Sequence, residues 1–161
     1  MIDDDLKSVT LIILLALAVI AVYPILNEGR VVEPFSELGV LGANGKIGDY
    51  PRQLVSGQNF NLTLYVGNHE GRVEYYRVVA KLSDETSNVS DVSPLDAQVK
   101  ASWETIISSG SNSTIPVRLS VGSAGLNRRL VFELWRYDVA SHDFVYDERW
   151  TQLWYNVTAT G

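Results

Sequence analysis

The stretch that decides the fold reads FNLTLYVGNHEGRVEYYRVVAKL and runs from Phe60 to Leu82. Apolar and polar residues alternate on both sides of a short turn, Gly67–Gly71. Alternation with a period of two is typical of strands that have one buried face and one face in solvent. Two such strands joined by a short glycine-containing turn predict a β-hairpin. We therefore expect a β-rich domain around this stretch.

The chain beyond this stretch continues the same pattern. A polar segment, Ser83–Pro94, predicts a surface loop, and Pro116 marks an edge strand because it cannot donate to a sheet ladder. Further strands are predicted at 99–107, 115–121, 130–135, 144–146 and 149–158. About seven short strands with turns between them predict an all-β, immunoglobulin-like antiparallel β-sandwich.

An apolar stretch precedes the β-rich region. Val9–Leu26 (VTLIILLALAVIAVYPIL) contains no charged residue. As a helix it would measure roughly 27 Å, close to the hydrocarbon thickness of a bilayer. A cleaved signal peptide is the alternative, with Val19 and Ala21 before the cut. The preceding residues include Asp3–Asp5 and only Lys7, whereas a signal peptide needs net positive charge. We therefore expect a retained transmembrane helix.

The orientation of this helix is predicted from glycosylation sequons. Lys7 and Arg30 flank the apolar stretch and cancel in the positive-inside count. Four Asn-x-Ser/Thr sequons all follow it, at Asn61, Asn88, Asn112 and Asn156. Alternation places Asn61 and Asn156 on solvent faces of their strands. We expect a single-pass protein of the cell membrane, with its N-terminus inside and its glycosylated domain outside.

The expected organisation has four parts. They are a cytoplasmic N-terminus (1–8), the transmembrane helix (9–26), a glycine-rich connector (27–48) and the extracellular β-sandwich domain (49–161). The connector has a glycine at every third position from Gly39 to Gly48. Since no Lys-Ser/Thr pair and no helix follow, a phosphate-binding loop is not predicted. An irregular connector with a turn at Asn44-Gly45 is predicted instead.

Composition excludes several classes of function. The net charge is −6 and no basic patch exceeds Arg128-Arg129, so nucleic acid is not an expected partner. The chain contains no cysteine, which excludes disulfides, thiolate metal sites and cysteine nucleophiles. Packing alone, or packing with assembly, must therefore stabilise the domain.

No catalytic, cofactor-binding or metal-binding constellation is predicted. His69 and His142 lie in predicted turns without further ligands at suitable spacing. Asp147-Glu148 is predicted as a solvated pair at the start of a strand. Asp84-Glu85 and Asp91 lack the spacing of a calcium loop. No serine lies in a Gly-x-Ser-x-Gly motif. We therefore expect a protein that is not an enzyme and has no cofactor.

The aromatic residues near the C-terminus offer the only candidate surface. Strict alternation places four of them opposite Leu134 and Leu153: Trp135, Tyr137, Trp150 and Trp154. An exposed face of this kind is unfavourable in water unless something covers it. One interpretation is a protein–protein interface, where aromatic anchors are favoured. The other is that alternation shifts by one near Arg136, or that these residues fill an end of the sandwich.

The residues from Pro34 to Leu82 carry a family resemblance. The run ELGVLGANGKIGDYP is followed by Gly57 and by GNHEG, with Tyr50-Pro51 and Asn68-His69-Glu70-Gly71 as its most specific parts. This pattern resembles an uncharacterised archaeal membrane-protein family, domain of unknown function 1616. The resemblance implies membrane helices followed by an extracytoplasmic β-domain similar to adhesion-type sandwich modules. It implies no activity, and this chain has one predicted span where the family has several.

These observations predict a non-enzymatic surface protein. Its helix contacts the lipid bilayer, and its β-sandwich contacts other membrane or envelope proteins, including copies of itself. A pilin-like filament subunit is the alternative, in which the apolar helix packs in a helical core and Asp5 lies near its head. No basic leader precedes the apolar stretch, which disfavours that alternative. An enzyme or small-ligand binder is disfavoured because no site assembles from the sequence.

Overall fold

The chain divides into two compact units, Met1–Glu33 and Pro34–Gly161. The computed structural model describes residues 2–27, 33–122 and 124–159. Residues 28–32 of the expected connector lie outside the described residues.

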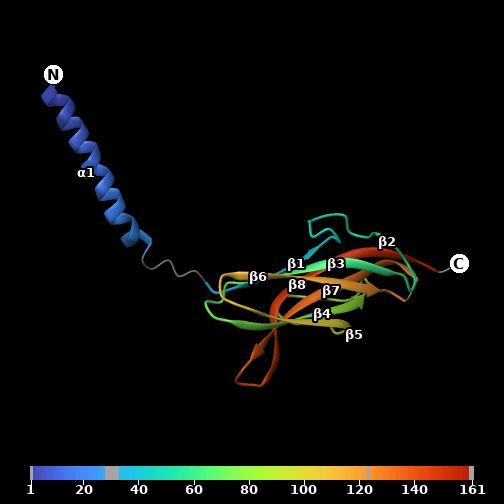
Figure 1. Ribbon diagram of the computed structural model, residues 1–161. Helices are drawn as coiled ribbons and strands as arrows, with labels where there is room; N and C mark the ends of the chain where they lie inside the picture. The colour runs from blue at the N-terminus through green and yellow to red at the C-terminus, as the bar shows by residue number, and fades with distance from the viewer. Residues whose placement is uncertain (1, 28–32, 123, 160–161) are drawn as a thin grey trace. The chain divides into compact units, whose positions relative to one another are not determined.

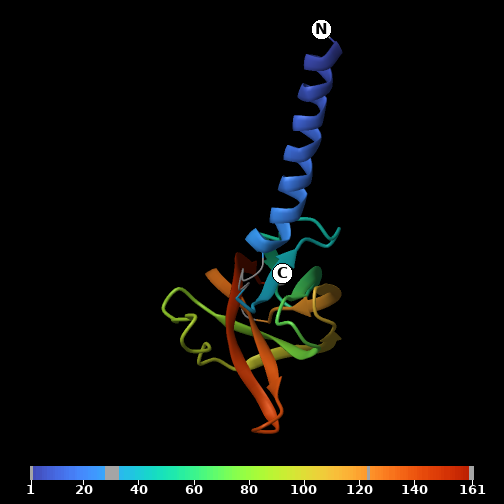
Figure 2. The same cartoon turned by 90° about the vertical axis from the view of Figure 1, so that its left-hand side faces the viewer.

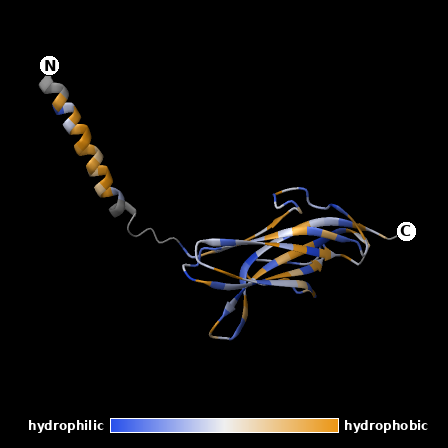
Figure 3. Cartoon of the chain, in the orientation of Figure 1, coloured by the Kyte–Doolittle hydropathy of each residue, from blue (hydrophilic) through white to orange (hydrophobic). Residues whose placement is uncertain are grey.

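The first unit is helix α1, Ile2–Asn27 (Figure 1). It begins before the predicted span and contains all of it. Within it, Leu6–Tyr23 has a mean hydropathy of 2.4 and no buried residue (Figure 3). In the described part of the chain, this is the one helix long and apolar enough to cross a membrane. A signal sequence meets the same criterion of length and composition, so the helix is a membrane span or a signal sequence.

The second unit is a β-sandwich of two sheets (Figure 1). Its described strands are β1 (Ser36–Leu41), β2 (Gln53–Val55), β3 (Asn59–Asn68), β4 (Glu74–Ser83), β5 (Val99–Ile107), β6 (Ser111–Ser120), β7 (Gly125–Asp138) and β8 (Asp143–Thr158). The smaller sheet has the order β1-β3-β6, and the larger has the order β2-β8-β7-β4-β5. All of these pairs are antiparallel except β2 with β8. The predicted immunoglobulin-like β-sandwich is confirmed.

The core lies between the two sheets and follows the predicted alternation. Every second residue of the paired strands points inward, and the largest fully buried apolar side chains include Leu62, Leu64, Tyr76, Phe132 and Leu134. The alternation is visible as hydropathy bands along the strands (Figure 3). Pro116 lies in β6, which is an edge of the smaller sheet as predicted. In β5, Ile107 joins the core and Ala101 and Trp103 pack against it, while Ile106 is exposed.

The predicted hairpin between residues 60 and 82 is wrong. The two strands exist, but β3 pairs with β1 and β6, whereas β4 pairs with β5 and β7. The turn between them crosses from one sheet to the other. Both strands have an apolar face, and those faces are buried equally well when the strands oppose each other across the core. The period of two predicts a strand and its buried face, but not its hydrogen-bonding partner.

The predicted connector also contains a strand. Ser36–Leu41 forms β1, which pairs with β3 from Ser36 opposite Asn68 to Leu41 opposite Thr63. Gly39 lies against Tyr65, where an added Cβ would already be 3.6 Å from the tyrosine Cβ. The regularly spaced glycines led to the prediction of an irregular connector, because they interrupt the alternation by which an edge strand would be recognised. The predicted turn at Asn44-Gly45 is confirmed, since Gly45 donates its backbone N–H to Gly42 at 2.9 Å.

Two features project from the larger sheet. The β7–β8 hairpin extends past the ends of the other strands in both views (Figures 1 and 2). The loop between β4 and β5, residues 84–98, folds back over the face that points away from the core. We call this the outer face of the larger sheet.

Candidate functional site

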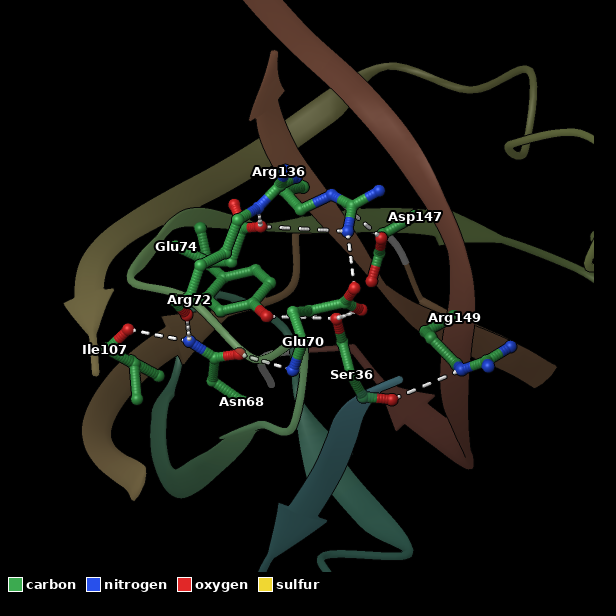
Figure 4. Close-up of polar contacts among 10 residues, drawn as sticks. Ser36, Asn68, Glu70, Arg72, Glu74, Ile107, Arg136, Asp147 and Arg149 are labelled. Atoms are coloured by element: carbon green, nitrogen blue, oxygen red, sulfur yellow. Dashed lines mark hydrogen bonds and ion pairs between the residues drawn. The ribbon is translucent and has the colours of Figure 1, made fainter. Parts of the chain in front are cut away.

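A polar cluster closes the end of the sandwich at which β1 begins (Figure 4). It starts from Asn68, the last residue of β3, whose side chain is fully buried. The Asn68 Nδ2 group donates to the backbone oxygens of Arg72 at 2.8 Å and Ile107 at 2.7 Å. Its Oδ1 accepts the backbone N–H of Glu70 at 2.9 Å. The amide thereby joins β3, the crossing turn and β5, and both its donors are used.

The crossing turn then positions Glu70. Gly71 has φ +78°, a conformation that a side chain at this position would strain, which explains Gly in the Asn-x-Glu-Gly pattern. The Ser36 hydroxyl donates to Glu70 Oε1 at 2.8 Å, and Arg136 Nη1 lies 2.9 Å from Glu70 Oε2. Ser36 lies at the start of β1 and Arg136 on β7. Glu70 therefore connects the smaller sheet to the larger one.

Arg136 is the centre of this cluster, which we call the Glu70–Arg136 cluster and define by Ser36, Asn68, Glu70, Glu74, Arg136 and Asp147 (Figure 4). Besides Glu70, Arg136 lies 3.5 Å from Asp147 and 3.9 Å from Glu74. Arg72 provides Glu74 with a second cation at 2.5 Å. Three carboxylates are therefore balanced mainly by two guanidinium groups. This arrangement ties together β1, the crossing turn, β4, β7 and β8.

Burial changes the acidity of two members of this region. It raises the pKa of the Asp147 carboxyl above its ordinary range, although Ser36 and Arg136 oppose the shift. Burial likewise raises the pKa of Tyr76 to about 12. The Tyr76 hydroxyl lies 3.0 Å from the Ser36 hydroxyl. Tyr76 therefore stays neutral at physiological pH, and its hydroxyl remains available for hydrogen bonding.

The raised pKa of Asp147 predicts a specific pH dependence of stability. The folded chain keeps the Asp147 proton to higher pH than the unfolded chain, so the contribution of Asp147 to stability falls as pH rises above about 4. Asp147→Asn cannot titrate, so its free energy of unfolding should improve relative to wild type between about pH 4 and about pH 7. Urea unfolding followed by tryptophan fluorescence measures this difference, and all tryptophans lie in the β-sandwich unit.

The matched control for this experiment is Asp138→Asn. Hydrogen bonds from Ser141 and Ala140 lower the pKa of Asp138, so its contribution to stability is present at neutral pH and lost on acidification. This variant should therefore lose stability relative to wild type over the same rise in pH. Equal pH profiles for the two variants would contradict both assignments.

The cluster does not form a recognisable catalytic arrangement among the described residues. Ser36 contacts Glu70 and Tyr76, neither of which is the neutral base that activates a serine nucleophile. His69 instead stacks on Phe35 at 4.5 Å and lies 3.5 Å from Glu37. No group of three or more His, Asp or Glu side chains that could hold a metal ion occurs in the described part of the chain. The geometry is that of a cluster that stabilises the packing of the two sheets.

A polar cavity of about 280 Å³ adjoins the Glu70–Arg136 cluster. Its described lining includes Ser36, Glu70, Arg136, Asp147 and Arg149. Arg149 donates to the backbone oxygen of Ser36 at 3.2 Å. Glu70, Arg136, Asp147 and Arg149 thus already hold partners within the chain.

The outer face of the larger sheet carries a second polar arrangement. Lys81 on β4 and Glu133 on β7 form an ion pair at 3.0 Å, and their side chains are 8% and 0% exposed. Lys81 also donates to the backbone oxygen of Leu95 at 2.6 Å, and Glu133 accepts the backbone N–H of Leu95 at 2.5 Å. Trp135 Nε1 donates to Glu133 at 3.2 Å. The buried pair therefore anchors the 84–98 loop to the sheet through Leu95.

The structure places all four predicted surface aromatics on this outer face. Trp150 and Trp154 of β8 lie opposite Glu133 and Arg129 of β7, and Trp135 and Tyr137 continue the same row. A register shift does occur after Leu134, but β8 absorbs it with two additional residues, which leaves the faces unchanged. The alternative of a one-residue shift in β7 is therefore wrong.

Part of the predicted aromatic surface is covered by the chain itself. The Tyr146 ring packs against Trp135 in a tilted arrangement with the ring centroids 5.7 Å apart, and its hydroxyl donates to the backbone oxygen of Ser90 in the 84–98 loop. Trp135 and Trp150 are half-buried, whereas Trp154 is 43% exposed at one end of the face. Tyr137 packs with Tyr75 and Phe144 at the other end.

The sequons occupy different environments. Asn61, Asn88 and Asn112 are exposed, on β3, in the 84–98 loop and on β6. Asn156 on β8 is half-buried, and its Oδ1 accepts the backbone N–H of Asn127 at 3.0 Å.

The geometry defines a class of protein before any relative is considered: an immunoglobulin-like β-sandwich module with one N-terminal apolar helix. A family model matches residues 30–156 and carries the description Domain of unknown function (DUF1616). The chain belongs to this family. No functionally curated protein matches it.

Solved structures resemble the β-sandwich unit at low sequence identity. One is a β-glucosidase from Listeria innocua, with 14% identity, a TM-score of 0.52, and coverage of 79% of this chain and 16% of that enzyme. The same enzyme in complex with glucose gives a TM-score of 0.51 at 14% identity, with coverage of 77% and 16%. A CARDB domain from Pyrococcus furiosus, in complex with di-metal ions, gives 0.48 at 8% identity, with coverage of 78% and 89%. The chain spans only about a sixth of the enzyme's length, and the likeness concerns the fold alone.

Sequence reasoning missed Arg136, Lys81 and Glu133. Glu133 had a detectable signal, since it lies within the apolar run LVFELW. A charge between apolar neighbours on both sides of a strand indicates a buried pair or a functional group. Arg136 had no such signal, because its partners are distant in sequence.

Proposed function

We propose that this protein is a non-enzymatic surface module that α1 holds in the cell membrane, with its β-sandwich outside the cell. In this proposal the β-sandwich acts through contacts with other membrane or envelope proteins. The observation that carries the proposal is the apolar helix, whose Leu6–Tyr23 segment has no buried residue. An isolated helix of this composition is unfavourable in water and favourable in a bilayer.

The β-sandwich unit supports the second half of the proposal. Its core is closed by its own strands, and its polar clusters are internally paired, as expected of a module that folds independently of the helix. Surface-exposed Asn61, Asn88 and Asn112 are available for glycosylation if the unit lies outside.

Cysteine labelling tests the orientation cleanly because the chain has no native cysteine. Asp4→Cys places a thiol in the first turn of α1, before its apolar Leu6–Tyr23 segment, and Ser102→Cys places one on the exposed face of β5. A membrane-impermeant maleimide applied to intact cells should label Ser102→Cys and should label Asp4→Cys only after permeabilisation. The opposite pattern would reverse the proposed orientation. A mature chain that lacks its N-terminal residues would show that α1 is a signal sequence.

Purification from native membranes in mild detergent tests the proposed mode of action. Tyr75, Tyr137 and Phe144 form a half-buried aromatic group at one end of the outer face, where Arg77 lies 3.7 Å over the Phe144 ring. A partner that co-purifies with wild type and is lost in Tyr137→Ala would support the contact surface. Release as a monomer without partners would contradict it. Sheared surface filaments rich in this chain would favour the pilin-like alternative.

A further inference from the structure

A cavity of about 540 Å³ lies beside β8 and the segment that leads into β2. Its volume falls within the roughly 300–1,000 Å³ that is usual for small-molecule sites. One wall consists of Tyr50, Arg52 and Gln53, and the other of residues 152–156 of β8, with Asn127 beside them. The Glu70–Arg136 cluster contributes no residue to this cavity.

The aromatic part of the wall is held in place by the rest of the chain. Trp154 is 43% exposed, and the Arg129 guanidinium lies over its ring at 5.5 Å. Arg129 donates to the Ser83 hydroxyl at 3.2 Å and to the backbone oxygen of Ser87 at 2.6 Å. A guanidinium at this distance is attracted to the face of an indole ring. Trp154 therefore offers the cavity a partly exposed aromatic surface that has one cationic neighbour.

The polar part of the wall is made mainly of amides. Gln53, Asn127, Gln152 and Asn156 all line the cavity, and an amide side chain carries both donors and an acceptor. Two of these groups already have partners, since Asn156 Oδ1 accepts the backbone N–H of Asn127 and Asn127 Nδ2 donates to Glu85 at 3.5 Å. Gln152 Oε1 is buried and has no hydrogen-bond partner among the described residues. A buried acceptor without a partner is unfavourable and is usually satisfied by water or a ligand. Arg52 is the only charged residue among those that line the cavity.

We propose that this cavity binds a saccharide ring. A pyranose presents an apolar C–H face, which an aromatic side chain such as Trp154 can cover, and a rim of hydroxyls that both donate and accept hydrogen bonds. Amide side chains match that rim in a way that carboxylates or aliphatic groups alone do not. The inference goes beyond the proposed function, and it does not depend on the side of a membrane on which the β-sandwich lies.

The same lining disfavours other ligands. None of the described lining residues carries a carboxylate, so a cation has no counter-charge and glycoside hydrolysis lacks its pair of acids. The site is therefore one for binding a sugar and not for cleaving it.

Saturation-transfer NMR on the full chain tests the proposal, with N-acetylglucosamine, glucose and glucuronic acid as probes and glycerol as the control polyol. The chain is produced in a host without N-glycosylation and kept in a detergent without a sugar headgroup, because alkyl glycosides would occupy the site. We expect transfer to the ring protons of at least one sugar and none to glycerol. Transfer to none of the three sugars, or equal transfer to glycerol, would overturn the proposal.

Variants locate the binding within the molecule. Trp154→Ala should weaken the affinity for the bound sugar by about tenfold, and Trp154→Phe should retain most of it. Tyr137→Ala, at the far end of the same face, should leave the affinity unchanged. Circular dichroism establishes that each variant is folded. If Trp154→Ala and Trp154→Phe both bind the sugar as wild type does, the cavity is not the site.

Two sources could supply the sugar: a separate saccharide or a glycan on the chain's own Asn156, which lines the cavity. Thr158→Val removes the sequon without changing a lining residue. If native glycosylated chain binds free sugar less well than this variant, the occupant is the chain's own glycan. If both bind equally, the occupant is a separate saccharide. Either conclusion holds only if the saturation transfer to the sugar is weakened by Trp154→Ala, which places the binding in this cavity.

Discussion

Replacing Lys81 with methionine should lower the free energy of unfolding of the β-sandwich by about 3–5 kcal/mol. Methionine keeps much of the aliphatic volume of lysine but removes the cation that lies 3.0 Å from Glu133. Glu133 is completely buried, so the remaining carboxylate would have no counter-charge and no access to water. The backbone oxygen of Leu95 would lose its donor as well. For a domain whose total stability is about 5–15 kcal/mol, this loss approaches unfolding.

Urea unfolding monitored by tryptophan fluorescence measures this loss, and the chain provides a matched control. Arg77 and Glu104 pair at 2.7 Å on the same face, but their side chains are 35% and 38% exposed. Arg77→Met should therefore cost only about 0–1 kcal/mol. The double variant Lys81→Met/Glu133→Leu should be less destabilised than the sum of the two single variants, because it leaves no unpaired buried charge. If Lys81→Met and Arg77→Met lowered the free energy of unfolding by similar amounts, the Lys81–Glu133 pair would be accessible to water in solution and not buried.

The buried pair explains how a polar loop becomes part of the folded domain. Ser83–Pro94, which makes up most of this loop, contains few apolar side chains, and its composition predicts a solvated surface loop. Leu95 directly follows that predicted segment. Leu95 is nevertheless only 2% exposed, and both its backbone groups are held by the ion pair. Composition describes most of the loop correctly. It does not reveal that one leucine and two charges on distant strands attach it to the sheet.

The fold was largely predictable because the alternation of neighbouring residues predicts which side chains of a strand are buried. Leu62, Leu64 and Leu119 each alternate with polar neighbours, and all three are buried as that period predicts. The pairing of strands was not predictable in the same way. Alternation specifies which face of β3 is buried but is silent about whether β4 lies beside it or across the core. In β1, the glycine at position 39 interrupts the alternation of apolar and polar residues, so that even the strand itself was not predicted.

The candidate sites illustrate the same limit more strongly. The predicted aromatics do share one face, since strand period alone determines that result. Their coverage by the 84–98 loop depends on contacts between residues about 40 to 60 positions apart, such as Tyr146 with Ser90. The Glu70–Arg136 cluster likewise joins residues from six segments: β1, β3, the crossing turn, β4, β7 and β8. The resemblance marked Asn68 and Glu70 as characteristic, and only the structure gives the physical reason.

Asn68 is the residue on which the crossing between the sheets depends, and Asn68→Ala should destabilise the β-sandwich by about 3 kcal/mol or more. The variant leaves two backbone oxygens, those of Arg72 and Ile107, without their donor and leaves the Glu70 N–H without its acceptor. Asn68→Asp should also destabilise, because a carboxylate cannot donate to either oxygen. Asn112→Ala removes an exposed asparagine and should change stability by no more than about 0.5 kcal/mol. Urea unfolding compares the three variants. If Asn68→Ala matched Asn112→Ala, the turn would be stabilised by its glycine and by the Glu70–Arg136 contact, and not by the buried amide.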